Sequence, residues 1–371
     1  MVFSRRFRMG QNPVFRLIRT LKPETLFPST MPSQALILFL LALPLHAQRV
    51  ENVLSPYRAE VDRRVNRGLD YLASVQTKEG YFLGKYGNTT GVVSLAGMAF
   101  LAKGHTPGYG PYGDAINRCI DYVLGMQKKN GLVAGRHSHG PMYSHSIATL
   151  FLSEVSGMVD PERQEKIDQV LGKAIRVLLA AQSVAKSSRH QGGWRYQPNS
   201  RDSDLSLSGW ALMALRSAKL NGAQVPDKAI EDAVKYIFKV HDPRNGRFGY
   251  QSGASHPVNL TGAALLCLEL TGHHGEDVTF KAGDYILKIK NQQSSYGLYY
   301  AAQATFQLGG KYWEQYATWM YGKRMAGQKE DGSWHGSWGA SYETATKILA
   351  FTVPYRQLPI YQRDETVDEE D

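Results

Sequence analysis

The chain has 371 residues, of which 43% are apolar and 20% are charged. This composition is that of a globular protein with a substantial core, and it excludes the disordered and fibrous classes. Two cysteines are too few for a disulfide scaffold or a cysteine-rich metal site. The net charge of +10 includes an acidic tail, so the body is more basic than the total indicates, which favours acidic partners such as phosphates or anionic lipids.

The first 47 residues are typical of a targeting segment. Residues 35–45 form an apolar run of signal-peptide length that is too short to span a membrane, and Ala47 offers a small-residue cleavage position. The basic stretch ahead of this run is either a long n-region or a consequence of translation that really begins at Met31. We therefore expect residues 1–47 to be an N-terminal extension and signal peptide, although a retained anchor is the alternative. The mature chain is then exported, periplasmic or secreted, and carries no transmembrane segment.

From residue 59 onward one unit recurs six times along the chain. Each unit has an amphipathic helix that ends on a glutamine or its substitute, and in five of them a glycine turn and an aromatic or apolar residue follow. The fifth unit lacks this turn and is shorter. The helix-ending residues are Gln76, Gln127, Gln182, His241, Gln292 and Gln328.

Each unit is predicted to be a hairpin of an outer and an inner helix. In the first helix, residues 61–75, the apolar residues keep helical spacing on one face, which is typical of a surface helix. The second helix of each unit is apolar on more sides, which indicates burial. These inner helices are predicted at residues 91–101, 143–155, 204–218, 258–270, 298–308 and 342–351.

The terminal units are as apolar as the central ones, whereas an open solenoid needs polar caps at its ends. We therefore predict an all-α fold, a closed (α/α)6 toroid of six helical hairpins. It forms a single domain over residues 48–363, and the acidic residues 364–371 follow as a disordered tail.

The recurring pattern Gln-x-x-x-Gly-x-aromatic resembles the QW-type repeat of the squalene cyclase and prenyltransferase superfamily. Residues 328–334 match it fully, residues 76–82 match it with a phenylalanine, and residues 191–194 match it loosely. The resemblance covers essentially the whole predicted mature chain and implies the toroid fold. In that superfamily the glutamine ties helix ends and the aromatic ring packs between repeats, so the motif implies structure rather than catalysis.

All inner helices of such a toroid run in the same direction, so their N-termini meet at one end of the ring, which we call the mouth. Residues that precede or begin these helices are the candidates for a functional site. Arg195 and other arginines of the same loops offer an alternative, anion-binding mouth. The predicted substrate-binding residues are Tyr143, His145, Tyr196, Trp210, Tyr296, Tyr299, Trp338 and Tyr342.

Asp202 and Asp204 are the sharpest feature of the predicted mouth. One aspartate suffices to cap a helix, and two at positions i and i+2 exceed that need. Class II terpene cyclases protonate their substrate with the middle acid of an Asp-x-Asp-Asp motif. The resemblance therefore implies Asp204 as the proton donor beside Asp202, with Leu205 in place of the third acid.

A second resemblance concerns the zinc site of protein prenyltransferases. Aligned on Trp210, Asp204 and Ser206 take the positions of an aspartate and a cysteine ligand, and His256 lies close to that of the histidine. This implies a divalent cation, Zn²⁺ or Mg²⁺, on Asp202, Asp204 and His256, and it adds His256 to the catalytic candidates. The sequence contains no nucleic-acid-binding motif.

Three functions stay open from the sequence. An exported protein that acts on or binds an isoprenoid or polycyclic lipid predicts a deep, aromatic cavity in the ring. A non-catalytic toroid that binds a small-molecule ligand or a protein partner predicts a filled centre, with both aspartates bonded to backbone amides. A lyase-like carbohydrate-active enzyme predicts an open groove. Fold alone does not choose among them.

Overall fold

The computed structural model describes residues 53–135, 140–255 and 258–361. The chain divides into two units, Met1–Arg49 and Val50–Asp371. All described residues belong to the second unit, so the predicted signal peptide, its cleavage site and the acidic tail lie outside them. Among the described residues, no helix is both long and apolar enough to cross a membrane.

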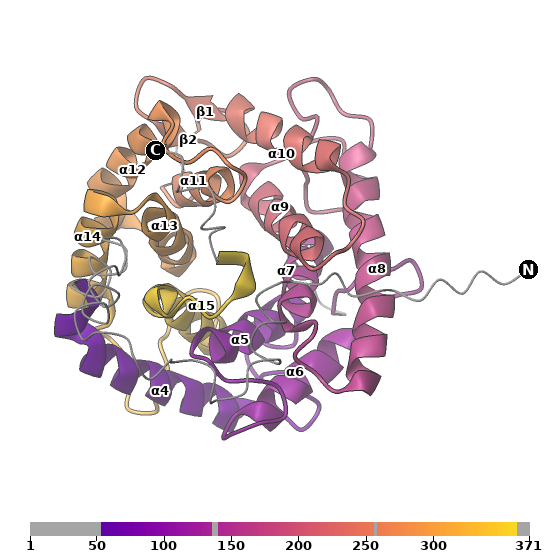
Figure 1. Ribbon diagram of the computed structural model, residues 1–371, viewed down its shortest axis with the longest axis vertical. Coiled ribbons are helices and arrows are strands. Elements are labelled where there is room, and N and C mark those ends of the chain that lie inside the picture. Colours follow the sequence, from indigo (N-terminus) through magenta and orange to yellow (C-terminus); the bar gives the residue numbers. More distant parts are fainter. Residues whose placement is uncertain (1–52, 136–139, 256–257, 362–371) are drawn as a thin grey trace, which may run out of the picture. The chain divides into compact units, whose positions relative to one another are not determined.

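The described part of the second unit contains twelve α-helices in two concentric rings (Figure 1). The inner ring is made of α5 (Thr90–Ala102), α7 (Pro141–Val155), α9 (Leu205–Leu220), α11 (Thr261–Glu269), α13 (Ser295–Leu308) and α15 (Ala340–Phe351). The outer ring is made of α4 (Arg58–Val75), α6 (Gly113–Gly125), α8 (Pro161–Ser183), α10 (Asp227–Lys239), α12 (Asp277–Ile289) and α14 (Gly310–Trp319). A short antiparallel hairpin, β1 (His241–Asp242) and β2 (Arg247–Phe248), joins α10 to α11.

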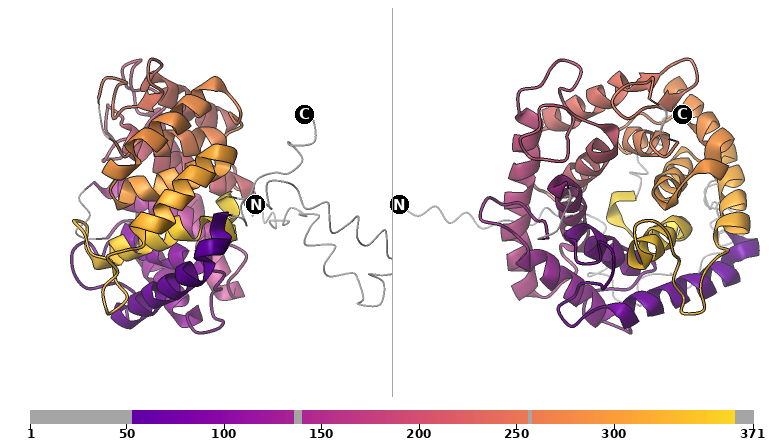
Figure 2. Two further views of the ribbon diagram at one scale, coloured as in Figure 1. Left: turned by 90° about the vertical axis from the view of Figure 1, so that its left-hand side faces the viewer. Right: turned by 180° about the vertical axis from the view of Figure 1, so that it is seen from behind.

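Both rings close on themselves. Each inner helix contacts the next one along the chain, and the last, α15, contacts the first, α5. The outer helix α4 packs on α15, and Arg64 of α4 donates a hydrogen bond to the carbonyl of Met325, just after α14 (3.0 Å). Figure 2 shows from behind that α4 continues the outer ring where α14 ends. The prediction of an all-α closed toroid is confirmed.

The two rings differ in burial as the sequence periodicity predicted. Every residue of the inner helix α5 is buried, because both rings surround it. The outer helix α4 buries only one stripe, at helical spacing. That stripe consists of Val61, Val65, Gly68, Leu69 and Leu72.

The repeated glutamines tie neighbouring units together through one recurring pair of hydrogen bonds. The Gln76 side-chain amide donates to the carbonyls of Gly80 in its own turn and Ala115 in the first turn of α6, both at 3.1 Å. Gln127, Gln182 and Gln328 make the same two kinds of bond. In the third unit Gln182 has this role, so the loosely matched Gln191 is not the tie.

The glycine of each turn is needed where the turn abuts the next outer helix. Gly192 has φ +93°, and a Cβ there would lie 2.0 Å from the carbonyl oxygen of Asp232 in α10. Gly80 has φ +95°, and a Cβ there would lie 2.2 Å from the carbonyl oxygen of Arg118 in α6. Only glycine tolerates both the left-handed backbone and this close approach. The glycine surplus of the sequence therefore has a structural cause.

Candidate functional site at the mouth

The inner helices run parallel, which places their N-termini at one end of the ring. At the starts of α5 and α7, the Thr90 hydroxyl donates to the carbonyl of Ser144 (3.5 Å). At the ends of α9 and α7, the Ser217 and Ser153 hydroxyl groups are hydrogen-bonded to each other (2.8 Å). Like ends therefore lie beside like ends, and the mouth exists as a physical site.

Asp204 lies at the N-terminus of α9 with its side chain fully buried. Its Oδ1 accepts hydrogen bonds from the backbone amide of Leu207 (3.0 Å) and from the Ser206 hydroxyl. Burial raises the pKa of this carboxyl, while the Ser206 hydroxyl, the Leu207 amide and the Arg195 charge oppose that rise. Asp204 therefore does cap α9, but the cap uses only one of its two carboxylate oxygens.

Arg195 joins the two aspartates. Its Nη1 lies 3.3 Å from Asp204 Oδ2, and its Nε lies 3.4 Å from Asp202 Oδ2. Asp202 is half exposed and does not cap the helix; it also accepts a hydrogen bond from the Gln251 amide (3.1 Å). The guanidinium therefore neutralises a carboxylate pair whose mutual repulsion would otherwise be costly.

Tyrosine rings surround this charged centre. The Arg195 guanidinium lies over the rings of Tyr196 and Tyr250, at 4.5 and 5.3 Å from their centroids, and the two tyrosine hydroxyls are hydrogen-bonded to each other. Tyr143 of α7 stacks on Tyr196 (5.7 Å between centroids), and its hydroxyl bonds to Ser206. The Tyr296 hydroxyl of α13 donates to the carbonyl of Ser206 (3.1 Å).

Four of the five predicted substrate-binding tyrosines keep exposed surface: Tyr196 in the loop before α9, and three at the starts of inner helices. Tyr143, Tyr296 and Tyr342 are each only partly buried, although they begin inner helices. Burial nevertheless raises the pKa of all three hydroxyls above the ordinary value. These three rings are therefore the predicted site residues at the helix starts that keep surface for contact with a ligand.

Below this level aromatic side chains pack against one another. Trp210 of α9 stacks on Tyr299 of α13, with 5.4 Å between ring centroids and 10° between planes. Tyr300 contacts both of these rings, at 5.2 and 5.0 Å. All three are buried, so Trp210 and Tyr299 form a floor beneath the mouth rather than a surface open to solvent.

His145 and Trp338 lie differently from the other predicted site residues. His145 is fully buried, accepts a hydrogen bond from the Val133 amide at Nδ1 (3.0 Å) and bonds to the Ala174 carbonyl through Nε2 (3.1 Å). Neither nitrogen is available to a ligand, and burial lowers the pKa of the ring to about 4. Trp338 is 50% exposed on the loop before α15, with its ring 6.3 Å from that of Tyr342.

The position of His145 belongs to the repeat. In other units a hydroxyl near the start of the inner helix accepts from the backbone amide of the motif aromatic: Ser208 from Trp194 (2.9 Å), Thr261 from Phe248 (3.0 Å) and Thr344 from Trp334 (2.9 Å). His145 replaces these hydroxyls in the second unit. It is therefore a structural acceptor, not the substrate-binding residue that we predicted, because its position in the repeat outweighs its proximity to the mouth.

The residues described at the mouth do not fit a divalent metal. Arg195 already lies between the two carboxylates, where a cation would have to bind. Among the described residues, no group of three or more His, Cys, Asp or Glu is arranged to hold a metal. The third predicted ligand and catalytic candidate, His256, lies outside the described residues.

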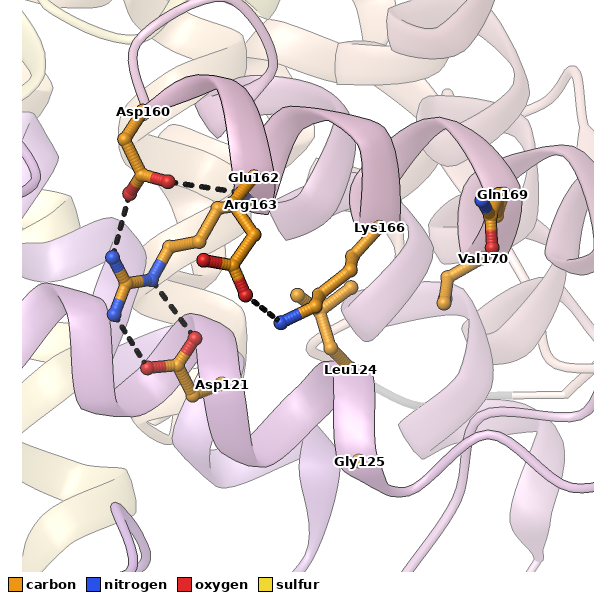
Figure 3. A pocket seen from close by; sticks show the side chains of 9 residues that line it. All are labelled: Asp121, Leu124, Gly125, Asp160, Glu162, Arg163, Lys166, Gln169 and Val170. Atoms are coloured by element: carbon orange, nitrogen blue, oxygen red, sulfur yellow. Dashed lines mark hydrogen bonds and ion pairs between the residues drawn. The ribbon is translucent and has the colours of Figure 1, made fainter.

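A pocket of about 450 Å³ lies on the outer wall, between α6 and α8 (Figure 3). Its charged side chains pair with one another: Arg163 with Asp121 and Asp160, at 2.8 and 2.6 Å, and Lys166 with Glu162 at 2.7 Å. A second pocket, of about 530 Å³, adjoins it through Asp121 and Gly125. The Arg163–Asp121 pair links the two outer helices. None of the predicted substrate-binding residues lines either pocket, although Asn88, which precedes α5, lines the second.

No family model and no curated protein matches the chain. Among solved structures, a protein from Actinoplanes is similar to it with a TM-score of 0.53 and 13% identity, over 80% of this chain and 99% of that chain. Type II terpene cyclase MstE from Scytonema is similar with a TM-score of 0.52 and 12% identity, over 81% and 100% of the two chains. The chain therefore has a terpene cyclase-like fold, which is the fold that the repeat resemblance implied.

The sequence analysis identified the tyrosines and aspartates of the mouth more fully than the residues that connect them. Ser206 and Tyr250 each contact at least two of the predicted site residues or arginine partners. Ser206 entered the sequence analysis only as the counterpart of a cysteine ligand, and Tyr250 belongs to no catalytic motif. Tyr250 lies just before the fourth inner helix, so the rule of helix starts applies to it as well. Arg195 follows the motif Trp194 directly, and that position was the available signal.

Proposed function

We propose that the chain binds an isoprenoid or polycyclic lipid at the mouth of the toroid. The polar end of the ligand lies at Asp204 and Arg195, and its apolar part lies against Tyr143, Tyr296 and Tyr342. The observation that carries the proposal is the fully buried Asp204 carboxylate beside aromatic rings that keep exposed surface. Enclosed apolar walls with a few convergent polar groups are what small-molecule sites share.

Binding, rather than turnover, is the activity that the polar contacts favour. Asp204 is held by a backbone amide, a hydroxyl and a guanidinium, and all three stabilise its charged form. A carboxylate held in this way orients Arg195 and a ligand hydroxyl. The stacked floor of Trp210 and Tyr299 supports a ligand that occupies only the mouth half of the ring.

Proton donation by Asp204 is the second candidate function. Burial raises the pKa of Asp204 in spite of its three partners, and a raised pKa is what a carboxylic acid needs to protonate an alkene. A lyase-like reaction has less support, because burial raises the pKa of Tyr143 and Tyr250 and so disfavours a tyrosinate base.

The test uses the full chain with geranylgeraniol and geranylgeranyl dihydroxybenzoate as probes. The second compound is described as the substrate of a variant of the Scytonema cyclase, whose structure with that compound gives a TM-score of 0.38 and 13% identity to this chain. Calorimetry measures binding, and mass spectrometry with chromatography detects cyclised products. Saturable binding with no product supports the proposal, and failure of both probes to bind contradicts it.

Matched variants separate binding from catalysis. Asp204→Asn keeps the cap acceptor but cannot donate a proton as an acid, so it abolishes turnover if Asp204 is the donor and changes affinity less than Arg195→Gln if it only binds. Asp160→Asn is the control, because Asp160 caps α8 through the Arg163 amide (3.0 Å) on the outer ring, far from the mouth in sequence and contacts. A loss of binding in the control as well as in Asp204→Asn indicates misfolding.

Export is a part of the proposal that rests on the sequence alone. The apolar run at residues 35–45 and the small residue Ala47 support cleavage before Gln48. Expression of the full chain in a bacterium, followed by N-terminal sequencing of the periplasmic or secreted fraction, tests it. An intact N-terminus in the cytosolic fraction contradicts export.

A further inference from the structure

The end of the ring opposite the mouth is occupied by the chain itself. After α15 the chain forms two short 3₁₀ turns, Val353–Tyr355 and Pro359–Tyr361. The second turn contacts α9, and Leu358, Ile360 and Tyr361 are all buried. Figure 1 shows this yellow segment inside the inner ring. We call Leu358–Tyr361 the C-terminal plug and the end of the ring that holds it the far end.

Side chains from three inner helices bind the backbone of the plug. At Ile360, the amide donates to Glu154 Oε2 of α7 (3.2 Å), and the carbonyl accepts from Arg216 Nη1 of α9 (2.8 Å). Gln307 of α13 donates to the carbonyl of Tyr361 (2.9 Å). The hydroxyls of Tyr361 and Tyr299 are hydrogen-bonded to each other, which links the plug to the aromatic floor.

These contacts differ from ordinary packing of a chain end. A buried carboxylate and guanidinium are expensive to desolvate, and apolar side chains would fill the same space without that cost. Here both charged groups are directed at one residue's amide and carbonyl, groups that every extended peptide offers. Glu154 is held in place by the Ser217 hydroxyl (2.5 Å), and Arg216 also donates to the carbonyl of Leu270.

The segment before the plug has the features of a hinge. Gln357 is exposed, and Arg356 has φ +50°, a left-handed conformation that is uncommon for a residue other than glycine. Pro354 and Pro359 flank these two residues. A short, exposed connection with an unfavourable backbone conformation allows the plug to leave without unfolding α15.

We propose that the far end of the ring is a binding site for a short peptide segment, which the chain fills reversibly with its own residues Leu358–Tyr361. The site recognises backbone amides and carbonyls through Glu154, Arg216 and Gln307, and a tyrosine hydroxyl through Tyr299. It is separate from the mouth, so the proposal does not depend on the lipid ligand proposed there.

The chain contains its own reporter for this site. Cys267 lies near the end of α11, is buried, and has a pKa raised by burial to about 12. Its Sγ lies 3.8 Å from the carbonyl oxygen of Gly209 in α9, the helix that the plug contacts. Cys119 of the outer helix α6 is equally buried, with a pKa also raised to about 12, but its partner is Gln76 (3.2 Å). We therefore expect opening of the far end to admit a reagent to Cys267 of the inner ring, while Cys119 of the outer ring stays covered.

The experiment measures how fast each cysteine of the native full chain reacts with a thiol reagent, with the two sites resolved by mass spectrometry. Ile360→Pro removes the backbone N–H that donates a hydrogen bond to Glu154, whereas Ile360→Val keeps it. We expect Ile360→Pro to raise the rate at Cys267 by about tenfold or more, with Cys119 unchanged and Ile360→Val like the unaltered chain. Tyr361→Phe, which loses only the hydroxyl contact, gives a smaller rise.

A peptide added in trans decides whether the far end is a binding site. The N-acetylated, C-amidated peptide Leu-Pro-Ile-Tyr, added at millimolar concentration to Ile360→Pro, is expected to return the rate at Cys267 to that of the unaltered chain. Three results overturn the proposal: unchanged Cys267 rates in both Ile360→Pro and Tyr361→Phe, a parallel rise at both cysteines, which indicates global unfolding, or no effect of the peptide.

Discussion

The two ends of the toroid are built from the same six helices but are finished differently. At the mouth, Asp204 and Arg195 form a charged centre under aromatic rings that keep exposed surface. At the far end, Glu154 and Arg216 form a second charged pair of groups, but the chain's own backbone satisfies them. An acid and an arginine thus serve an open site at one end and a filled site at the other.

The difference shows what a ring of parallel helices offers. N-termini carry unpaired amides and partial positive charge, which suit a carboxylate such as that of Asp204. The C-terminal ends carry unpaired carbonyls, and Arg216 donates to one of them, at Leu270, as well as to the plug. The ends of the ring are therefore chemically distinct before any ligand binds, and each prediction below tests one end against the other.

The largest effect is expected at the floor that separates the two ends. Tyr299→Ala removes a buried ring stacked on Trp210 and the hydroxyl that bonds to Tyr361. We expect a loss of about 3–5 kcal/mol in the free energy of unfolding, because the cavity cannot collapse within a closed ring. Denaturant unfolding measures it. Tyr299→Phe, which keeps the ring, should lose much less; equal losses would show that the stacking contributes nothing.

At the far end, the contribution of Glu154 to stability should fall as the pH rises. Burial raises the pKa of Glu154 from 4.5 to about 7, against the opposing effects of Ser217, Ile360 and Arg216. A group whose pKa is higher in the folded state contributes stability that is fully present below the unfolded pKa and is lost as the pH rises through the folded value. The loss between pH 4.5 and 7 should amount to a few kcal/mol.

Thermal unfolding of the unaltered chain and of Glu154→Gln across this range measures the far-end effect. The part of the stability that Glu154 loses between pH 4.5 and 7 should be absent in the variant, because glutamine carries no charge. The buried groups that face Glu154 are Ser217, Arg216, Tyr299 and Tyr361. None of these four groups changes its charge below pH 8. A persistent loss in Glu154→Gln would contradict the assignment.

Near the mouth end of the same helix, α7, the contribution of His145 to stability should fall as the pH drops. Burial lowers the pKa of His145 from 6.5 to about 4. The folded state thus favours the neutral form of the His145 ring. The stability that this ring contributes is therefore complete above pH 6.5 and is lost as the pH falls toward 4. His145→Gln, which can keep an acceptor for Val133 and a donor for Ala174, should flatten this acid limb in the same unfolding measurement. An unchanged acid limb would assign it to other groups.

The sequence predicted the fold because the repeat expresses it locally. Gln76 and Gly80 each contact a neighbouring unit and Phe82 is buried, so the periodicity of such triplets encodes the ring. The far end has no such periodicity: Glu154, Arg216 and Ile360 come together from three separate segments and occur once each. The available signal was a charged residue inside an otherwise apolar inner helix, at Glu154 and again at Arg216.

The mouth was predictable in outline because helix starts converge in a toroid. Two of its predicted residues are more buried than their positions near helix starts suggested, for physical reasons. His145 lies at a helix start, but the repeat requires an acceptor there for the Val133 amide. Trp210 lies one and a half turns into α9, where the neighbouring ring of Tyr299 covers it. Residue type and position along the chain do not reveal which face of an inner helix another ring covers.

A smaller effect is expected at the cap of α9. Asp204→Ala removes the acceptor for the Leu207 amide and should cost about 1–2 kcal/mol, whereas Asp204→Asn should cost less because it keeps that acceptor. Asp160→Ala, which removes the corresponding cap of α8, is the comparison on the outer ring. Denaturant unfolding ranks the three variants. A much larger loss in Asp204→Ala than in Asp160→Ala would show that Arg195, left without its buried partner, dominates at the mouth.

The smallest effect is expected from chelation. Arg195 lies between Asp202 and Asp204 and supplies the positive charge that a divalent cation would supply, so removal of free metal should leave the site intact. The thermal midpoint of the full chain should therefore be the same with and without EDTA. Arg195→Gln sharpens the comparison: it leaves two carboxylates without a cation, and added Zn²⁺ or Mg²⁺ should then stabilise the variant more than the unaltered chain. A shift with EDTA in the unaltered chain that Asp204→Asn abolishes would instead restore the metal site, with His256 as its third ligand.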